Sequence, residues 1–199
     1  MIVLASASRR RQELLRNAGV SFTVQAADIP ETPFAGEAPR MLAERLAREK
    51  AGAVSRQRPN DVVLGADTIV VVEGQILGKP QDASDAVRML RLLSGRSHQV
   101  TTGVCLMSPV QPQVGPGNQI SGTGFEDIRS ETTLVTMAAL TDEDIHSYVA
   151  NGEPMDKAGA YAIQGMASRW ISRIEGDYFN VVGLPVALVY RMLREHEVI

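Results

Sequence analysis

The stretch Val62–Val72, with the sequence VVLGADTIVVV, decides the fold of this 199-residue chain. It is almost continuously apolar and β-branched, which is typical of a central strand covered on both faces. Asp67 interrupts the run, and burying an unpaired carboxylate costs roughly several kcal/mol. Gly65 and Ala66 before it are small, as though another group must approach the backbone closely. We therefore predict a central strand whose aspartate is functional; the alternative is a structural aspartate that caps a neighbouring loop.

Apolar runs and amphipathic stretches follow one another along the rest of the chain. Short apolar runs predict strands, whereas stretches with helical periodicity between capping residues, Pro or Gly predict helices. Strands are expected at 2–5, 20–26, 62–72, 75–77, 98–107 and 132–140, and helices after the loop at 6–8, at 39–56, at 82–94, at 141–151 and from 185. This order predicts an α/β fold with a mixed, largely central β-sheet flanked by helices. Because no linker divides the chain, we expect a single domain over residues 1–199.

Residues 108–131 differ in composition from the rest of the chain. They are rich in Gly, Pro, Gln and Ser and contain few large apolar residues. Such a segment cannot bury enough apolar surface to become well ordered. We predict a flexible hairpin loop between the strands at 98–107 and 132–140.

Composition and charge exclude several classes of protein. The net charge of −3 gives no basic field, so nucleic acid is not an expected partner. Cys105 is the only cysteine, which precludes an intrachain disulfide and fits a reducing compartment. No segment reaches the roughly 20 apolar residues of a membrane span, and the apolar start of the chain is too short for a signal peptide. We expect a cytoplasmic protein with no membrane partner.

Three consecutive arginines stand where the first helix is expected to begin. Arg9, Arg10 and Arg11 directly follow Ser8. Cations at this place oppose the helix dipole, and the first N–H groups of the helix lack intrahelical partners. An anion would satisfy both, so the segment is suited to bind phosphate. The alternative, a solvated basic turn, is the commoner role of an arginine run.

Two lysines could add to such a site. Lys50 shares a stripe with Leu42, Leu46 and Val54, so it lies on the buried face of its helix. Its ammonium group could instead reach solvent at the edge of that stripe. Lys79 follows a short predicted strand and could equally be an exposed turn residue.

Together with the carboxylate of Asp67, these cations could bind a polyphosphate and activate a water molecule to attack it. The chain has no P-loop motif and no GxGxxG after a strand, so neither a P-loop enzyme nor a dinucleotide enzyme is indicated. His98, His146 and His196 lack metal-ligand spacing, and Cys105 has no basic neighbour in the sequence.

Several segments, taken in chain order, resemble the Maf family of nucleoside triphosphate pyrophosphatases. Each motif alone is weak, but the ordered set covers nearly the whole chain. The segments are LASASRRRQELL at 4–15, ETP at 31–33, LGADTIV at 64–70, GKP at 78–80, SGRSHQVTTGV at 94–104, DKAGAYAIQG at 156–165 and VVGLP at 181–185. The resemblance implies a two-lobed α/β fold with a cleft, similar to inosine triphosphatases, and frequent homodimers. It also implies hydrolysis of a nucleoside triphosphate between the α and β phosphates with a divalent cation, usually magnesium.

The resemblance also assigns roles by position. Asp67 would be the base that activates water and a ligand of the metal. Substrate would be bound by Ser8, Arg10, Arg11, Glu31, Lys50, Thr68, Lys79 and Gln164. The branch of the family that acts on dTTP and UTP looks like this sequence at Arg10, Thr68 and Gln164. The resemblance therefore predicts a dTTP/UTP pyrophosphatase, with modified pyrimidine triphosphates as further candidate substrates. Hydroxyl and amide groups can read the edge of a pyrimidine, which fits this prediction.

Two alternative functions go with the same family resemblance. Another branch of the family acts on 7-methyl-GTP and carries other residues at those places. A non-catalytic nucleotide-binding regulator of cell division would need the same phosphate ligands. The chain departs from the family at Arg9, where proline is usual, which makes the phosphate loop more cationic and less rigid. The loop at 108–131 is also longer than expected and has no assigned role.

Overall fold

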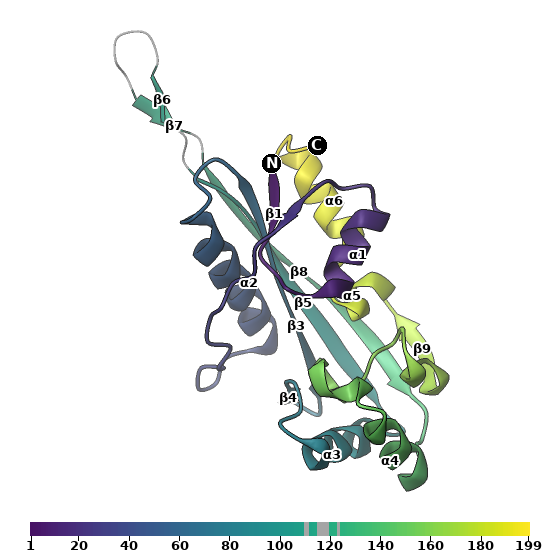
Figure 1. Cartoon of the computed structure of the whole chain (residues 1–199). Coiled ribbons are helices and arrows are strands. Elements are labelled where there is room, and N and C mark those ends of the chain that lie inside the picture. Colours follow the sequence, from purple (N-terminus) through teal and green to yellow (C-terminus); the bar gives the residue numbers. More distant parts are fainter. Residues whose placement is uncertain (110–111, 115–119, 123) are drawn as a thin grey trace. The chain divides into compact units, whose positions relative to one another are not determined.

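The computed structural model describes residues 1–109, 112–114, 120–122 and 124–199 (Figure 1). Its main sheet is seven-stranded, with the order β2-β1-β3-β5-β8-β9 and with β4 paired to β3. The strands are β1 (Ile2–Leu4), β2 (Thr23–Val24), β3 (Val62–Val72), β4 (Gln75–Leu77), β5 (Ser97–Ser108), β8 (Phe125–Met137) and β9 (Ile171–Glu175). Because β1 is parallel to β2 and β3 whereas β4 is antiparallel to β3, the predicted α/β fold with a mixed sheet is confirmed.

Contacts within the chain divide it into two compact units. The first unit comprises Met1–Asp67, Gly103–Ser130 and Val186–Ile199, and the second comprises Thr68–Thr102 and Glu131–Pro185. The first unit contains the helices α1 (Arg9–Asn17), α2 (Pro39–Ser55) and α6 (Val186–Glu195). The second contains α3 (Ala83–Leu93), α4 (Asp142–Ala150) and α5 (Tyr178–Val182). The strands β3, β5 and β8 each contribute residues to both units.

The predicted helices begin at the capping residues that the sequence offers. Ser8 caps α1 and Asp82 caps α3, each by accepting a backbone N–H through its side chain. Thr141 and Asp144 form a reciprocal capping box at the start of α4. Pro39 occupies the first turn of α2, where its missing N–H leaves no hydrogen bond unmade. Local chemistry therefore fixes where these helices start.

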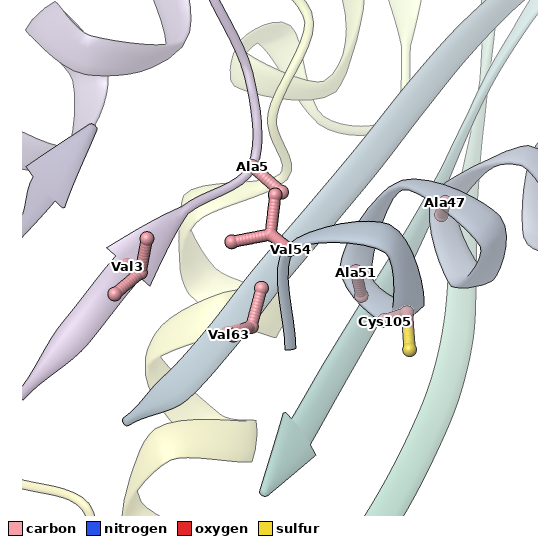
Figure 2. Packing of buried hydrophobic residues seen from close by; sticks show 7 residues of the cluster. All are labelled: Val3, Ala5, Ala47, Ala51, Val54, Val63 and Cys105. Carbon is pink, nitrogen blue, oxygen red and sulfur yellow. The ribbon is translucent and has the colours of Figure 1, made fainter. Parts of the chain in front are cut away.

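Helix α2 lies so close to β3 and β5 that both strands need a glycine beneath it. A Cβ atom at Gly65 would stand 2.2 Å from the carbonyl oxygen of Ala47. A Cβ atom at Gly103 would stand 2.2 Å from the carbonyl oxygen of Ala43. The group that approaches the backbone at Gly65 is thus a helix of the same unit. Figure 2 shows the small apolar side chains that pack around this contact, namely Val3, Ala5, Ala47, Ala51, Val54, Val63 and Cys105.

The second strand is shorter than predicted. We expected residues 20–26, but β2 contains only Thr23 and Val24, which pair with Val3 and Leu4 of β1. An edge strand can extend only as far as its neighbour, and β1 itself ends at Leu4. Both β2 residues are exposed, so no buried face lengthens the strand.

The predicted loop at 108–131 extends too far, because β8 already begins at Phe125. Its first residues contact His196, which directly follows α6: the Phe125 ring stacks on His196 with centroids 3.9 Å apart, and His196 Nε2 lies 2.9 Å from Asp127 Oδ2. Arg129 forms ion pairs with both Asp127 and Glu195. Side chains at alternate positions thus hold this end of β8 on the helix.

Two further strands lie within the predicted loop. β6 (Pro112–Val114) and β7 (Ile120–Gly122) pair antiparallel, with Gln113 opposite Ser121. The predicted flexibility of residues 110–111, 115–119 and 123 lies outside the described residues.

The second unit contains elements that the sequence did not predict. β9 pairs antiparallel with β8, and Asp177 caps α5, because its carboxylate accepts the N–H of Phe179 at 2.7 Å. Three short 3-10 helices, η1 (Glu153–Asp156), η2 (Ala158–Ala160) and η3 (Met166–Trp170), follow α4, which packs against α3. These short, tight turns are too brief to give a helical or strand periodicity. Among the helices of the described ranges, none has both the length and the apolar character that crossing a membrane requires.

Candidate functional site

Lys50 lies at the centre of a charge cluster in the first unit, in which Lys50 and Asp67 are buried. Its Nζ donates to Asp67 Oδ1 at 2.6 Å and to Glu31 Oε1 at 2.5 Å. Lys50 and Asp67 are each only 8% exposed, so the lysine does not extend to solvent. Asp67 therefore has the cationic partner that burial in an apolar strand requires. We call Lys50, Asp67 and Glu31 the acid–lysine cluster.

Backbone packing directs the two buried members of this cluster toward each other. Asp67 follows Gly65 by two residues in β3, so both point to the face of the strand that α2 covers. Lys50 lies on the buried stripe of α2 with Leu42 and Leu46, as its spacing predicted. The close contact at Gly65 thus brings the helix backbone near enough for the lysine to reach the carboxylate. Glu31 comes from the loop between β2 and α2 and is more exposed.

The arginine run at the start of α1 lies in the same unit. Arg11 is buried, and its Nη1 donates to Ser6 Oγ at 3.2 Å. Burial lowers the pKa of Arg11, whereas the negative charges of Asp67 and Glu31 raise it, so the guanidinium is electrostatically linked to the acid–lysine cluster. The positive charge of Arg10 also lowers this pKa. The structure therefore brings Arg11 into the field of the cluster, with the charge of Arg10 acting on Arg11.

Ser8 is the N-cap residue of α1. Its Oγ accepts the N–H of Arg11 at 3.5 Å and so caps α1. Arg9 is exposed at the first helical position, whereas Arg10 is half-buried. The run is therefore not a uniformly solvated basic turn.

The second unit holds the other predicted site residues. Thr68 shares a hydrogen bond of 2.9 Å with Thr102 and donates to the carbonyl oxygen of Gly183 at 3.4 Å. It follows Asp67 within β3, which runs on to Val72, so the two side chains point to opposite faces. Lys79 is exposed in the turn after β4.

Gln164 is exposed on a turn that contacts the buried part of its unit. We call residues 162–166 the Gln164 turn. The carboxylate of Glu153 accepts the hydroxyl of Tyr148 at 2.7 Å and the N–H of Met166 at 3.2 Å. A Cβ atom at Gly165 would stand 2.1 Å from Glu153 Oε1. Tyr148 is fully buried, so the turn is anchored to the interior of its unit.

The donor set of the acid–lysine cluster suits magnesium better than a transition metal. The described residues contain no group of three or more His, Cys, Asp or Glu side chains that could hold a metal ion by themselves. Magnesium is usually held by one or two carboxylates together with water and substrate phosphates. Asp67 and Glu31 bring two carboxylates to one ammonium group, which fits that mode.

Sequence reasoning missed one residue that organises the surroundings of Glu31. Arg45 forms ion pairs with Glu37 and Glu49. The pair with Glu49 could have been found from its i,i+4 spacing on a helix. The pair with Glu37 joins a loop to a helix, and no periodicity in the sequence indicates it.

An α/β fold with arginines and an acid–lysine cluster in one unit defines a protein equipped to bind an anionic ligand. A family model described as "Maf-like protein" matches residues 1–196, and the chain belongs to the Maf family. Over 193 residues the chain is 56% identical to a protein of Koribacter versatilis named dTTP/UTP pyrophosphatase, covering 97% of this chain and 93% of the relative. A protein of Syntrophomonas wolfei with the same name is 48% identical over 190 residues, covering 96% and 94%. Among solved structures, the Ham1 protein of Staphylococcus aureus aligns over 98% of both chains with a TM-score of 0.49 and 15% identity.

Proposed function

We propose that this chain is a nucleoside triphosphate pyrophosphatase that hydrolyses dTTP and UTP. One water molecule adds across the bond between the α and β phosphates, which gives the nucleoside monophosphate and pyrophosphate. The acid–lysine cluster carries the proposal, because a buried carboxylate next to cations suits the activation of water against a polyphosphate. The names of relatives that align over nearly the whole chain support the substrate choice.

In this proposal Asp67 accepts the proton of the attacking water. Lys50 Nζ, at 2.6 Å, holds the carboxylate in one orientation. A rigidly placed base needs little reorganisation when the proton is transferred.

Asp67 and Glu31 are the residues that would hold magnesium. When bound there, the ion would neutralise phosphate oxygens and lower the pKa of a coordinated water. Both carboxylates lie on one lysine, which would keep them close together for the ion.

Cations near the cluster are proposed to bind the phosphates. Arg10 and Arg11 lie in the first turn of α1, where backbone N–H groups also favour an anion. Lys79 is the proposed phosphate ligand of the second unit. Gln164 is the proposed reader of the base, since its exposed amide can match the paired donor and acceptor of uracil or thymine. Thr68 is proposed to act beside it, with a hydroxyl whose place is fixed by Thr102.

The setting of the enzyme is also proposed. Burial raises the pKa of the Cys105 thiol to about 12, which makes this lone cysteine a packing residue and suits a reducing cytoplasm. The net charge of −3 speaks against nucleic acid as a partner. A homodimer is proposed from the family resemblance, and light scattering of the purified protein tests it.

A pyrophosphate-release assay over dTTP, UTP, 7-methyl-GTP and ATP, with and without magnesium, tests the function. We expect high specificity constants for dTTP and UTP and low ones for the other two. A clear preference for 7-methyl-GTP contradicts the substrate assignment. Tight nucleotide binding without hydrolysis of any of the four would favour a regulatory role.

A further inference from the structure

The loop that carries Glu31 has no helix or strand to hold it. Residues 25–38 connect β2 to α2 without regular secondary structure. A carboxylate on such a loop needs other contacts to keep a constant position. Lys50 Nζ holds the Glu31 side chain, but one ion pair to a partly exposed group does not order a loop.

One guanidinium group, that of Arg45, holds this loop at several points. Its Nε and Nη2 donate to the two carboxylate oxygens of Glu37 at 2.7 and 2.8 Å. Its Nη2 also donates to the carbonyl oxygen of Thr32 at 3.1 Å. The guanidinium lies 4.0 Å from the ring centroid of Phe34, whose N–H is bonded to Glu37 at 3.0 Å. We call Arg45, Glu37 and Phe34 the Arg45 clamp.

The charged groups of the Arg45 clamp are largely buried and hold one another in fixed positions. The Arg45 side chain is 18% exposed and that of Glu37 only 8%. The guanidinium of Arg45 lowers the pKa of Glu37 to about 2, so this carboxylate stays charged over the whole physiological range. Nη1 of Arg45 also pairs with Glu49 at 3.1 Å, which fixes the guanidinium relative to α2. A bidentate fork of this kind has one orientation, which a lysine cannot reproduce.

We propose that Arg45 is a positioning residue of the acid–lysine cluster. Thr32, which the clamp holds, directly follows Glu31 in the chain, and Arg45 and Lys50 lie on the same helix. The clamp fixes the backbone next to Glu31, and this places the Glu31 carboxylate on Lys50 and beside Asp67. Arg45 itself touches no member of the cluster through any contact described above. The metal-related part of this inference rests on the proposed function.

The test is a double-mutant cycle between Arg45→Ala and Glu31→Gln. The measured quantity is the magnesium concentration that gives half-maximal hydrolysis of dTTP. Loss of a residue that supports a metal ligand typically weakens metal affinity by about 10-fold or more, and we expect that change for Arg45→Ala. In the Glu31→Gln background, Arg45→Ala should add less than about 2-fold, since the ligand it positions is already lost. Equal effects in both backgrounds overturn the proposal.

Arg48→Ala is the matched control. Arg48 lies on the same helix and pairs with Glu126 at 2.8 Å, and its side chain is 58% exposed. It should leave the magnesium requirement unchanged. Arg45→Lys keeps the charge without the fork and should resemble Arg45→Ala; full activity of Arg45→Lys at low magnesium would contradict the proposal. This variant also serves if Arg45→Ala does not fold.

A second readout does not depend on activity. In the metal-free protein, amide hydrogen exchange at residues 28–38 should accelerate in Arg45→Ala and stay unchanged in Arg48→Ala. Calorimetric titration with magnesium alone should weaken in parallel with the kinetics. If the wild-type protein hydrolyses no triphosphate, the proposed function fails, whereas the exchange experiment still decides whether Arg45 orders the loop. Unchanged exchange in Arg45→Ala overturns the positioning role.

Discussion

Lys50 Nζ donates to Asp67 Oδ1 at 2.6 Å, and both residues are 8% exposed. The pair joins helix α2 to strand β3, whose backbones meet at Gly65. Removing one partner of a buried ion pair leaves an uncompensated charge, which typically costs about 3–5 kcal/mol. For variants of either residue, the free energy of unfolding and the turnover rate must therefore be measured separately.

Asp67→Asn is expected to lower turnover of dTTP by roughly 100-fold or more, because it removes the proposed proton acceptor but keeps its shape. Nucleotide binding, measured by calorimetry, should persist. Asp61→Asn is the control, since Asp61 precedes the same strand and pairs with the N-terminal amine instead. Near wild-type turnover of Asp67→Asn would make this aspartate structural.

Arg10→Ala is expected to weaken binding of pyrophosphate and the triphosphate while leaving the melting temperature nearly unchanged. Its charge opposes the dipole of α1 unless an anion is bound, so its loss costs the free protein little. Arg9→Ala is the neighbouring control, because Arg9 is exposed at the helix start. If Arg10→Ala binds pyrophosphate as tightly as the wild-type protein does, Arg10 is not a phosphate ligand.

Gly165→Ala is expected to reduce the preference for dTTP over ATP. The added methyl group would meet the Glu153 carboxylate and displace the Gln164 turn. Gln164→Ala should change the ratio of specificity constants in the same direction, since a site that pairs a polar edge rejects mismatched bases strongly. Gly52→Ala is the control, because its nearest neighbour would be Arg56 Nη1 at 3.8 Å. An unaltered ratio in Gln164→Ala means that this residue does not read the base.

His98 is expected to make stability fall as the pH falls from about 6.5 to about 4. It is buried against the hydroxyl of Tyr161 at 2.7 Å, and burial lowers its pKa from 6.5 to about 4. In this window the unfolded chain binds a proton and the folded chain does not, so protonation favours unfolding. His98 changes the free energy of unfolding by at most roughly 3 kcal/mol across this window, and above and below the window its contribution does not depend on pH.

Urea unfolding between pH 7 and 4.5 measures this effect. His98→Gln keeps a polar partner for Tyr161 but cannot titrate, so its stability should depend less steeply on pH. His146→Gln, at an exposed position on α4, should retain the wild-type slope. Identical slopes for all three proteins would mean that His98 titrates at its ordinary pKa.

Much of the fold could be predicted because its signals are local. The apolar run of β3, the caps at Ser8 and Thr141 and the buried stripe that includes Lys50 all act within a few residues. The sequence also indicated that Asp67 needs a cation, since that follows from burial alone. The sequence did not indicate which cation pairs with Asp67, because Lys50 and Asp67 are 17 residues apart.

The remaining features depend on contacts between distant segments. β2 is limited by its partner β1, and the start of β8 is held by α6 near the other end of the chain. The pairing of Arg45 with Glu37 and Thr32 joins a loop to a helix and follows no period. Only a three-dimensional arrangement reveals such contacts.

The glycines beneath α2 have a consequence for a saturation mutagenesis experiment. A screen that scores catalysis alone would find almost no tolerated substitution at Gly65 or Gly103, although neither carries a functional group. Ranked by intolerance, both positions would stand beside the reacting residues and could be mistaken for them. A parallel screen for soluble expression would separate the classes: glycine variants should lose both signals, whereas Arg10→Ala, whose loss costs the free protein little, should lower catalysis alone. The distance between helix α2 and the sheet therefore depends on two glycines, Gly65 and Gly103, and mutation of either would change it.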